Sequence, residues 1–279
     1  MRRHAERLLS VALLVLAAMI VPASAAFAAA PPNDSESAAT RIAGLPFTET
    51  VDTTEATASG PRFCSNNGSV FYRFTPAADV QIQFDTIGSD YDTTLAIYTR
   101  DAAGKVQPIR GKCNDDRFGL ASGLRLRASA GVTYYFQVGM CCGYGNDGGG
   151  KLTVTVTEVR SGPLEFAVAV TDPGTFGSAT GIATLSGTLT CNKRSVGGFE
   201  GMLRQLRDGM FVARGYVSLW TVCTPGAAVP WEVEVDTETG VAFGPGAVLL
   251  RTWYEYASDG FRDYVELPGE DTTIQLVSG

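Results

Sequence analysis

Apolar and polar side chains alternate along most of the chain beyond residue 30. The alternation is strict in Val80–Asp85, Leu124–Arg127, Val132–Val138 and Leu152–Thr157. Because successive side chains of a strand point to opposite faces, each segment predicts a strand with one dry and one wet face. Turn-rich stretches separate these segments, and no window shows the 3.6-residue period of an amphipathic helix. The pattern predicts an all-β chain built from antiparallel sandwiches.

A break in this pattern at residues 160–163, with the sequence Arg-Ser-Gly-Pro, divides the strands into two series. The second series is expected in these segments: Leu164–Val170, Gly181–Cys191, Gly215–Cys223, Trp231–Asp236, Ala247–Glu255 and Thr272–Val277. Each series has the length of an ordinary domain, so we expect two β-sandwich domains, residues 31–160 and 161–279. The linker is short, which predicts semi-rigid neighbours.

Residues 1–30 have the pattern of a secretory signal peptide. A basic start precedes the apolar run Leu8–Val21, and the small residues after it offer Ala-x-Ala cleavage after Ala28 or Ala30. The run is shorter than the roughly 20 residues needed to cross a bilayer. We therefore expect a secreted, extracellular protein without a membrane span.

The composition of the chain argues against several classes of function. Without the leader the chain carries 19 basic and 28 acidic residues, which makes nucleic acid an unexpected partner. The single histidine, His4, lies in the leader, so imidazole chemistry is excluded from the mature chain. No G-x-S-x-G elbow occurs. We expect no enzyme, and the catalytic alternative is a histidine-free hydrolase that uses two carboxylates.

Six cysteines in an exported chain are expected to form disulfides. Cys191 and Cys223 fall in the second strand series, each on the apolar side, and should pair across a sandwich core. The first series holds the other four: Cys64, Cys113, Cys141 and Cys142. Pairing Cys64 with Cys113 closes a loop of about 50 residues, worth roughly 4 kcal/mol, and leaves two adjacent cysteines. Adjacent Cα atoms lie about 3.8 Å apart, closer than disulfides prefer, so the split pairing stays open.

Residues 31–158 resemble the bacterial pre-peptidase C-terminal domain, a secreted β-sandwich module found beside extracellular proteases. The matching blocks follow in order: Pro32–Asp34, Gly44–Phe47, Ser69–Pro76, Gly88–Thr99, Cys113–Asp116 and Ala130–Gly139. The resemblance implies a jelly-roll-like accessory module without chemistry of its own, used for adhesion, substrate targeting or protease maturation, sometimes with bound calcium.

The second half resembles, on Leu185–Cys191 and Cys223, small secreted immunoglobulin-like domains of unknown function. The two cysteines are closer in sequence than the inter-sheet pair of antibody domains. The resemblance therefore implies only an immunoglobulin-like sandwich.

Calcium is the one cofactor that the residues suggest. It takes six to eight oxygen ligands, and the candidates lie in turn regions: Asn33, Asp34, Asp90, Asp92, Asp115 and Asp116. The resemblance places the first two in the N-terminal ligand segment of calcium-binding members. Those members have acidic residues before the Tyr-x-Phe strand, where this chain has Asn67, Ser69 and Val70. The competing interpretation is that the six side chains cap turns.

Aromatic residues are the other candidates for binding. Trp220, Trp253 and Tyr135 lie in expected strands, where an exposed ring can stack on a sugar or anchor a protein partner. Packing in the core is the competing interpretation. The sequence thus favours a non-catalytic binding, adhesion or substrate-targeting protein of the bacterial exterior. Its partner would be a polymer, a glycan or an exported protein, and the alternative role is as a maturation or stability accessory of a secreted protease.

Overall fold

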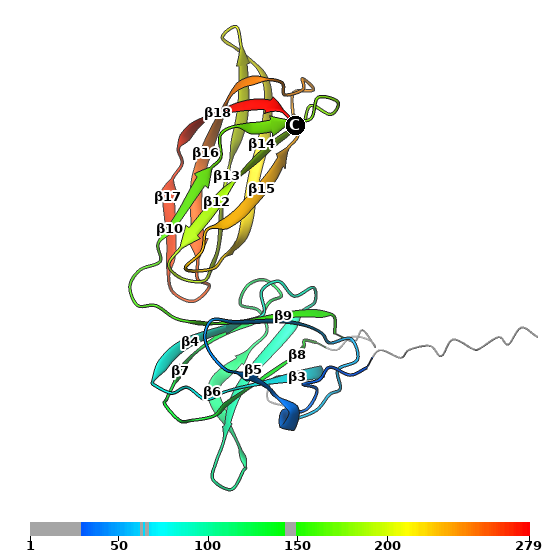
Figure 1. The fold of residues 1–279 in the computed structure, drawn as a ribbon, viewed down its shortest axis with the longest axis vertical. Helices are drawn as coiled ribbons and strands as arrows, with labels where there is room; N and C mark the ends of the chain where they lie inside the picture. Colours follow the sequence, from blue (N-terminus) through cyan, green and yellow to red (C-terminus); the bar gives the residue numbers. More distant parts are fainter. Residues whose placement is uncertain (1–28, 62–63, 65–66, 143–148) are drawn as a thin grey trace, which may run out of the picture.

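The computed structural model describes residues 29–61, 64, 67–142 and 149–279. The proposed leader, apart from its last two residues, lies outside this part. The described residues form one short 3-10 helix, η1 (Glu36–Ala38), and eighteen strands, which confirms the predicted all-β sandwich fold (Figure 1). Among the described residues, no helix has the length and apolarity required to cross a membrane.

The first nine strands form two facing sheets, here called the N-terminal sandwich. One sheet has the order β1 (Thr40–Ile42), β3 (Asn67–Phe74), β8 (Tyr134–Met140), β5 (Thr93–Arg100) and β6 (Val106–Asn114). The other has the order β2 (Phe47–Asp52), β9 (Lys151–Glu158), β4 (Val80–Asp85) and β7 (Gly123–Ala128). The dry faces of the two sheets enclose one apolar core, in which Tyr72, Phe84 and Phe136 are fully buried.

The remaining strands form the C-terminal sandwich, which lies beside the first and follows it through one linker (Figure 1). Its strands are β10 (Phe166–Val170), β11 (Gly174–Phe176), β12 (Ala183–Cys191), β13 (Ser195–Arg207), β14 (Met210–Cys223), β15 (Val229–Val235), β16 (Gly246–Ser258), β17 (Tyr264–Pro268) and β18 (Asp271–Ser278). Strands β10, β12 and β15 pair on one side, and β18, β16, β13 and β14 on the other, with β11 bonded to both β12 and β18. This connectivity agrees with an immunoglobulin-like sandwich.

Strand β13 is the longest of the strands that the alternation did not predict. Gly197, Gly198 and Gly201 interrupt its hydrophobic pattern, and glycine disfavours strands. The strand nevertheless runs for 13 residues between β14 and β16, because its neighbours supply both hydrogen-bond ladders. The centre of the sheet is therefore set by tertiary pairing.

The six described cysteines form three disulfides. Cys64 bonds Cys113 and Cys191 bonds Cys223, with Cα atoms 5.6 and 6.1 Å apart. The adjacent Cys141 and Cys142 bond each other. The favoured pairing is thus the one present, and the split pairing of the first four cysteines is not. Cys191 and Cys223 link β12 to β14, which explains their short spacing.

A buried ion-pair network joins the two sandwiches. Arg194, just after β12, donates from Nε and Nη2 to the two carboxylate oxygens of Asp85 on β4, at 2.6 and 2.8 Å. The Gln83 amide donates to Asp85 at 3.2 Å and its oxygen accepts from Arg125. Arg125 in turn donates to Asp259 at 2.6 Å. Arginine and aspartate side chains from both sandwiches thus alternate along the junction.

This network corrects one expectation about β4. The alternation of Val80–Asp85 predicts that Gln83 and Asp85 lie on a wet face, yet they are 2% and 0% exposed. The second sandwich covers that face, and a polar group buried without a partner is costly, so each of the two side chains bonds a partner across or along the junction.

The loop of residues 259–263, between β16 and β17, fits against the N-terminal sandwich. Asp259 Oδ1 accepts the backbone N–H groups of Phe261, Arg262 and Asp263. The Phe261 ring contacts the edge of Phe118, with centroids 6.1 Å apart. Gly260 has φ +71°, and a Cβ there would lie 2.2 Å from Phe118, so only glycine permits this approach.

Burial opposes ionisation of Asp259, but hydrogen bonds from the Phe261 N–H and from Arg125 outweigh it and hold the pKa below its usual range. The carboxylate therefore stabilises the fold above its unfolded pKa of about 3.9, and that contribution is lost as pH falls through the lower folded value.

Removing the Cys191–Cys223 disulfide should destabilise the protein far more than removing the adjacent pair. The first closes a loop with sequence separation 32 and the second a loop with separation 1. Chain entropy predicts a loss of about 4 kcal/mol for C191A/C223A and about 1 kcal/mol for C141A/C142A. Urea unfolding of the two double variants measures this difference, and equal losses would contradict the loop-entropy explanation.

Substituting Asp85→Ala should lower the free energy of unfolding by about 3–5 kcal/mol, because Arg194 would be left buried and unpaired. The matched control is Glu238→Ala, which removes the partner of Arg214 in an exposed pair, with N–O distance 3.6 Å, and should cost less than about 1 kcal/mol. Urea unfolding followed by intrinsic fluorescence checks both. If Asp85→Ala behaves like the exposed control, the network does not hold the junction.

Candidate ligand-binding surface

Six aromatic side chains gather on the outer side of the sheet formed by β14, β13, β16 and β17. We call this surface the aromatic face, and its members are Tyr216, Trp220, Trp253, Tyr254, Tyr256 and Tyr264. Trp220 is 45% exposed and Trp253 48% exposed. Large apolar rings of this size are normally buried, so their grouping on one open sheet makes the aromatic face a candidate binding surface.

Strand periodicity and one irregularity produce this grouping. On β14, Val217 and Leu219 are buried, so Tyr216 and Trp220 point outward. On β16 the register shifts: Glu200 of β13 pairs with Tyr254, and Gly201 pairs with Thr252. Trp253 is the extra residue of this β-bulge, so the consecutive Trp253 and Tyr254 are both accessible from the outer side.

Three of the rings form a row across the strands. Gly198 of β13 pairs with Trp220 on one side and with Tyr256 on the other. Because Gly198 has no side chain, the two rings meet above it, with centroids 5.9 Å apart. Tyr256 then stacks on Tyr264 of β17, with centroids 6.4 Å apart. The centroids of the two end rings, Trp220 and Tyr264, are therefore at most about 12 Å apart.

Two of the other three rings, Tyr216 and Tyr254, interact with the carboxylate of Glu200. Tyr216 and Trp253 are in contact, with ring centroids 5.7 Å apart. Tyr254 donates its hydroxyl to Glu200 at 2.9 Å, and this hydrogen bond raises the Tyr254 pKa above its ordinary value. Burial, and then Glu200, raise the Tyr216 pKa in the same way. Glu200 is therefore an oriented acceptor among the rings.

The structure separates the three predicted binding residues. Trp220 and Trp253 lie on the aromatic face, whereas Tyr135 lies on β8 of the N-terminal sandwich. The Tyr135 ring stacks on Tyr98, with centroids 5.5 Å apart, and lines a separate cavity of about 380 Å³ with Arg41 and Arg73.

Tyr216 and Tyr264 were not identified from the sequence. The shared parity of Tyr216 and Trp220 on one strand was a usable signal. No sequence signal marked Tyr264, because its position on the aromatic face depends on the pairing of β17 with β16.

Three of the calcium candidates hold the backbone in place. The Asn33 amide donates to the Phe71 carbonyl at 3.3 Å. Asp34 accepts from the N–H and the hydroxyl of Thr57, at 2.6 and 2.7 Å. Asp90 accepts the Lys151 N–H at 2.9 Å. These partners lie 38, 23 and 61 residues away, so the three side chains hold distant segments together and these bonds are not the local bonds of a turn cap.

The other three candidates lie near one another at the ends of β5 and β6. Burial raises the pKa of Asp92, and the negative charges of Asp116 and Asp115 raise it further. In the described part of the chain, Asp92 Oδ1 is buried without a hydrogen-bond partner. Within the ranges that the structure describes, no three carboxylates of the candidate set lie within 4.8 Å of one another, and calcium at Asp92, Asp115 and Asp116 stays a prediction.

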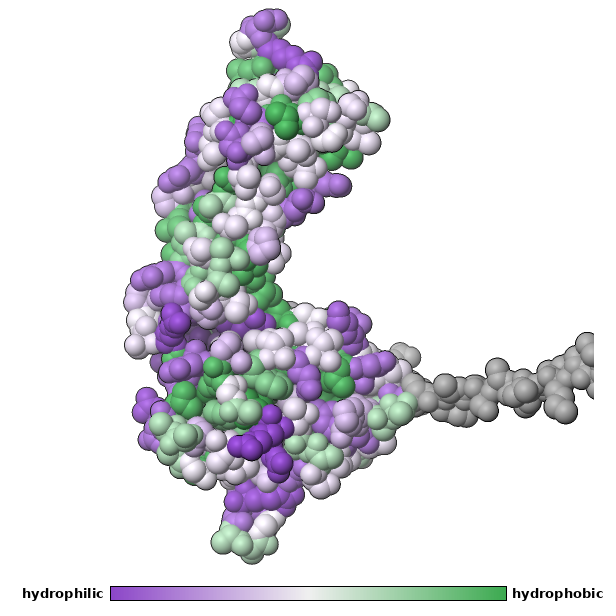
Figure 2. Space-filling view, viewed as in Figure 1, coloured by the Kyte–Doolittle hydropathy of each residue, from purple (hydrophilic) through white to green (hydrophobic). Residues whose placement is uncertain are grey.

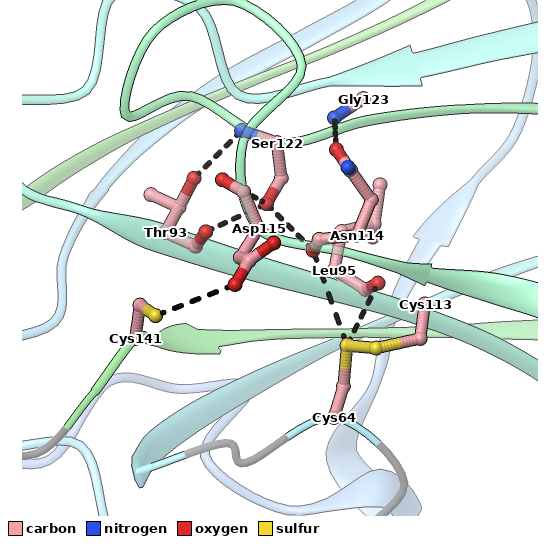
Figure 3. The surroundings of a disulfide bond; sticks show 9 residues. All are labelled: Cys64, Thr93, Leu95, Cys113, Asn114, Asp115, Ser122, Gly123 and Cys141. Atoms are coloured by element: carbon pink, nitrogen blue, oxygen red, sulfur yellow. Dashed lines mark hydrogen bonds between the residues drawn. A yellow bond between two sulfur atoms is a disulfide. The ribbon is translucent and has the colours of Figure 1, made fainter.

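The adjacent disulfide borders this acidic group. Asp115 Oδ2 lies 3.7 Å from Cys141 Sγ, as Figure 3 shows, and a disulfide sulfur carries no proton, so this is a packing contact. Among the described residues, the one group of three metal-ligating side chains within 4.8 Å is Asp92 with Cys141 and Cys142. The disulfide removes the thiolates that a metal would need, so only Asp92 of that group offers a ligand.

Comparison with known proteins gives no family. No family model matches the chain, and no curated protein matches it. Among solved structures, the ApaA protein from Bordetella pertussis is 11% identical with a TM-score of 0.28, over 41% of this chain and 95% of that one.

Two further structures match more of this chain. A GH2 beta-galacturonidase from Eisenbergiella tayi is 10% identical with a TM-score of 0.23, over 85% of this chain and 44% of that one. A DUF4785 family protein from Legionella pneumophila is 12% identical with a TM-score of 0.22, over 83% and 60%. All three TM-scores are too low to assign a shared fold.

Asp92→Asn should raise the melting temperature of the protein in the presence of a chelator. A raised carboxyl pKa means that folding disfavours the ionised group, so a neutral isostere relieves the burial and the repulsion. Glu232→Gln, at an exposed position of β15, is the control and should leave the melting temperature unchanged.

The same melts test calcium. If Asp92, Asp115 and Asp116 hold the ion, millimolar calcium raises the melting temperature of the wild type and not that of Asp92→Asn. An Asp92→Asn variant that melts below the wild type in chelator would contradict the explanation from repulsion.

Proposed function

We propose that this protein is an extracellular, non-catalytic carbohydrate-binding protein, and that the aromatic face is its binding surface. The observation that carries the proposal is a group of six rings on one face of a sheet, of which Tyr254 and Tyr256 are half-buried and four are exposed, with Trp220 and Trp253 both nearly half exposed. The three disulfides fit an extracellular location, which the signal peptide expected from the sequence would supply.

A sugar matches the chemistry of this face better than a purely apolar ligand. Sugar rings have apolar C–H faces that can lie on aromatic rings, and hydroxyls that need hydrogen-bond partners. Ser218 and Tyr254 lie opposite Glu200 on the two neighbouring strands, so hydroxyl and carboxylate groups lie among the rings. The face thus offers both kinds of contact within one surface.

The arrangement also favours an extended chain of sugars. The row from Trp220 to Tyr264 extends over about 12 Å between its end centroids and crosses four strands, so its three rings offer more than one stacking position. The rings contact one another, which restricts their rotamers before any ligand arrives and lowers the entropic cost of binding. Recognition of a polymer agrees with the adhesion or targeting role that the pre-peptidase C-terminal resemblance implies for the first half.

The test is retention of purified residues 31–279 on insoluble cellulose, chitin, xylan and bacterial cell walls. Replacing the two exposed tryptophans in W220A/W253A should weaken binding to the retained polymer at least about thirtyfold, since stacked aromatic anchors dominate such surfaces. The matched control is Phe211→Ala, an aromatic residue 61% exposed at the β13–β14 turn, outside the aromatic face, which should leave binding within about twofold.

Two outcomes would overturn the proposal. Equal retention of the wild type and W220A/W253A would place binding elsewhere. Absence of retention on every polysaccharide, with a secreted protein captured through the tryptophans instead, would make the aromatic face a protein-docking surface.

A further inference from the structure

A basic cavity lies at the junction of the two sandwiches. Its volume is about 400 Å³, and the side chains that line it include Gln81 of β4, Lys112 of β6, Arg125 and Arg127 of β7, and Phe261 and Arg262 of the loop after β16. Both sandwiches contribute to it, so the cavity exists only while the junction is formed. In the space-filling view the two bodies meet in direct contact (Figure 2).

The lining of this cavity carries more basic side chains than there are acidic side chains paired with them. Arg125 pairs with Asp259, and the other acid of the loop, Asp263, pairs with Lys193 away from the cavity lining. In the part of the chain that the structure describes, no carboxylate oxygen lies within 4.0 Å of a side-chain nitrogen of Lys112, Arg127 or Arg262. A chain with a net charge of −7 therefore leaves three positive charges together at one place.

The surroundings of Lys112 show that its charge lacks a counterion. Its ammonium donates to the Arg125 backbone carbonyl, a neutral acceptor, and burial lowers its pKa from the ordinary value. An anion in the cavity would supply the missing negative charge and further acceptors. Arg127 and Arg262 carry planar guanidinium groups, whose paired N–H donors match the oxygens of a carboxylate or sulfate.

The cavity adjoins the aromatic face. Arg262 is two residues before Tyr264, the last ring of the row, so their Cα atoms are at most about 7 Å apart. The last ring of the row is thus close to a residue that lines the cavity. The volume of about 400 Å³ is within the usual range for small-molecule sites.

We propose that the junction cavity binds the anionic group, a carboxylate or a sulfate ester, of an acidic polysaccharide whose neighbouring sugars lie on the aromatic face. This proposal rests on the proposed carbohydrate function and adds the class of sugar. Arg127 and Arg262 would contact the anion, and Phe261 would line the wall beside it. Arg125 would remain paired with Asp259 and form part of the cavity wall.

The first test uses small anions, so that it does not depend on the polysaccharide. Sodium glucuronate and inorganic sulfate are titrated into isotope-labelled residues 31–279, and the arginine side-chain NMR signals are followed. The expected result is saturable shifts of the Arg127 and Arg262 signals that R127Q/R262Q abolishes. The matched control, R41Q/R73Q, removes two arginines from the cavity of about 380 Å³ in the N-terminal sandwich and should leave the shifts unchanged.

The outcomes separate the sources of the anion. Tighter binding of glucuronate assigns a uronic acid, and tighter binding of sulfate assigns a sulfate ester. The absence of saturable shifts, or shifts that persist in R127Q/R262Q, would overturn the proposal. Tighter binding of inorganic phosphate than of either probe would also overturn it, because a phosphate-bearing partner would then be favoured.

The second test separates this proposal from the proposed function. Affinity is measured for a uronic-acid oligosaccharide and for the same oligosaccharide with its carboxyls reduced to alcohols. R127Q/R262Q should weaken binding of the acidic form at least about tenfold and leave the neutral form unchanged, whereas W220A/W253A should weaken both. If R127Q/R262Q binds the acidic form as the wild type does, the anion site is refuted and the aromatic site stands. If W220A/W253A weakens neither form, the proposed function fails by itself.

Discussion

The structure depends on the buried pair of Arg194 and Asp85, which joins two sandwiches that have separate apolar cores. Two charges removed from water are costly unless their hydrogen bonds are satisfied, and here Asp85 accepts from the Arg194 fork and from Gln83. An apolar interface tolerates small slides, whereas a bidentate ion pair specifies one orientation. The network therefore favours one orientation of the two sandwiches, the one in which the basic cavity lies between them.

The second determinant is β13, whose glycines let neighbouring strands present aromatic rings. Gly198 leaves room for Trp220 and Tyr256 to meet, and the register shift at Glu200 and Gly201 makes Trp253 and Tyr254 accessible together. The same strand supplies Glu200 as an acceptor among the rings. The glycines and the register shift, which disfavour β13 as an isolated strand, thus make room for the aromatic face to which we assign function.

The sequence predicted what depends on local periodicity. Val80–Asp85 is a strand with the predicted bounds, and the parity of Cys223 placed it correctly on the buried side. Features that depend on distant residues were not predictable. Arg194 and Asp85 are 109 residues apart, so nothing local showed that the wet face of β4 would be covered. Trp253 was proposed for its residue type, but the bulge that places it beside Tyr254 depends on the partner strand. The calcium candidates were grouped by residue type, and Asn33, Asp34 and Asp90 instead have backbone partners elsewhere in the fold.

If the ion-pair network holds the two sandwiches as one rigid body, the junction cavity persists beside the last ring of the aromatic face. The most direct measurement is a set of residual dipolar couplings for backbone amides in both sandwiches of residues 31–279. For a rigid junction we expect a single alignment tensor to fit all couplings with the orientation of the structure. Two tensors of different magnitude would show independent motion of the sandwiches and would contradict it, because the junction cavity would then not persist.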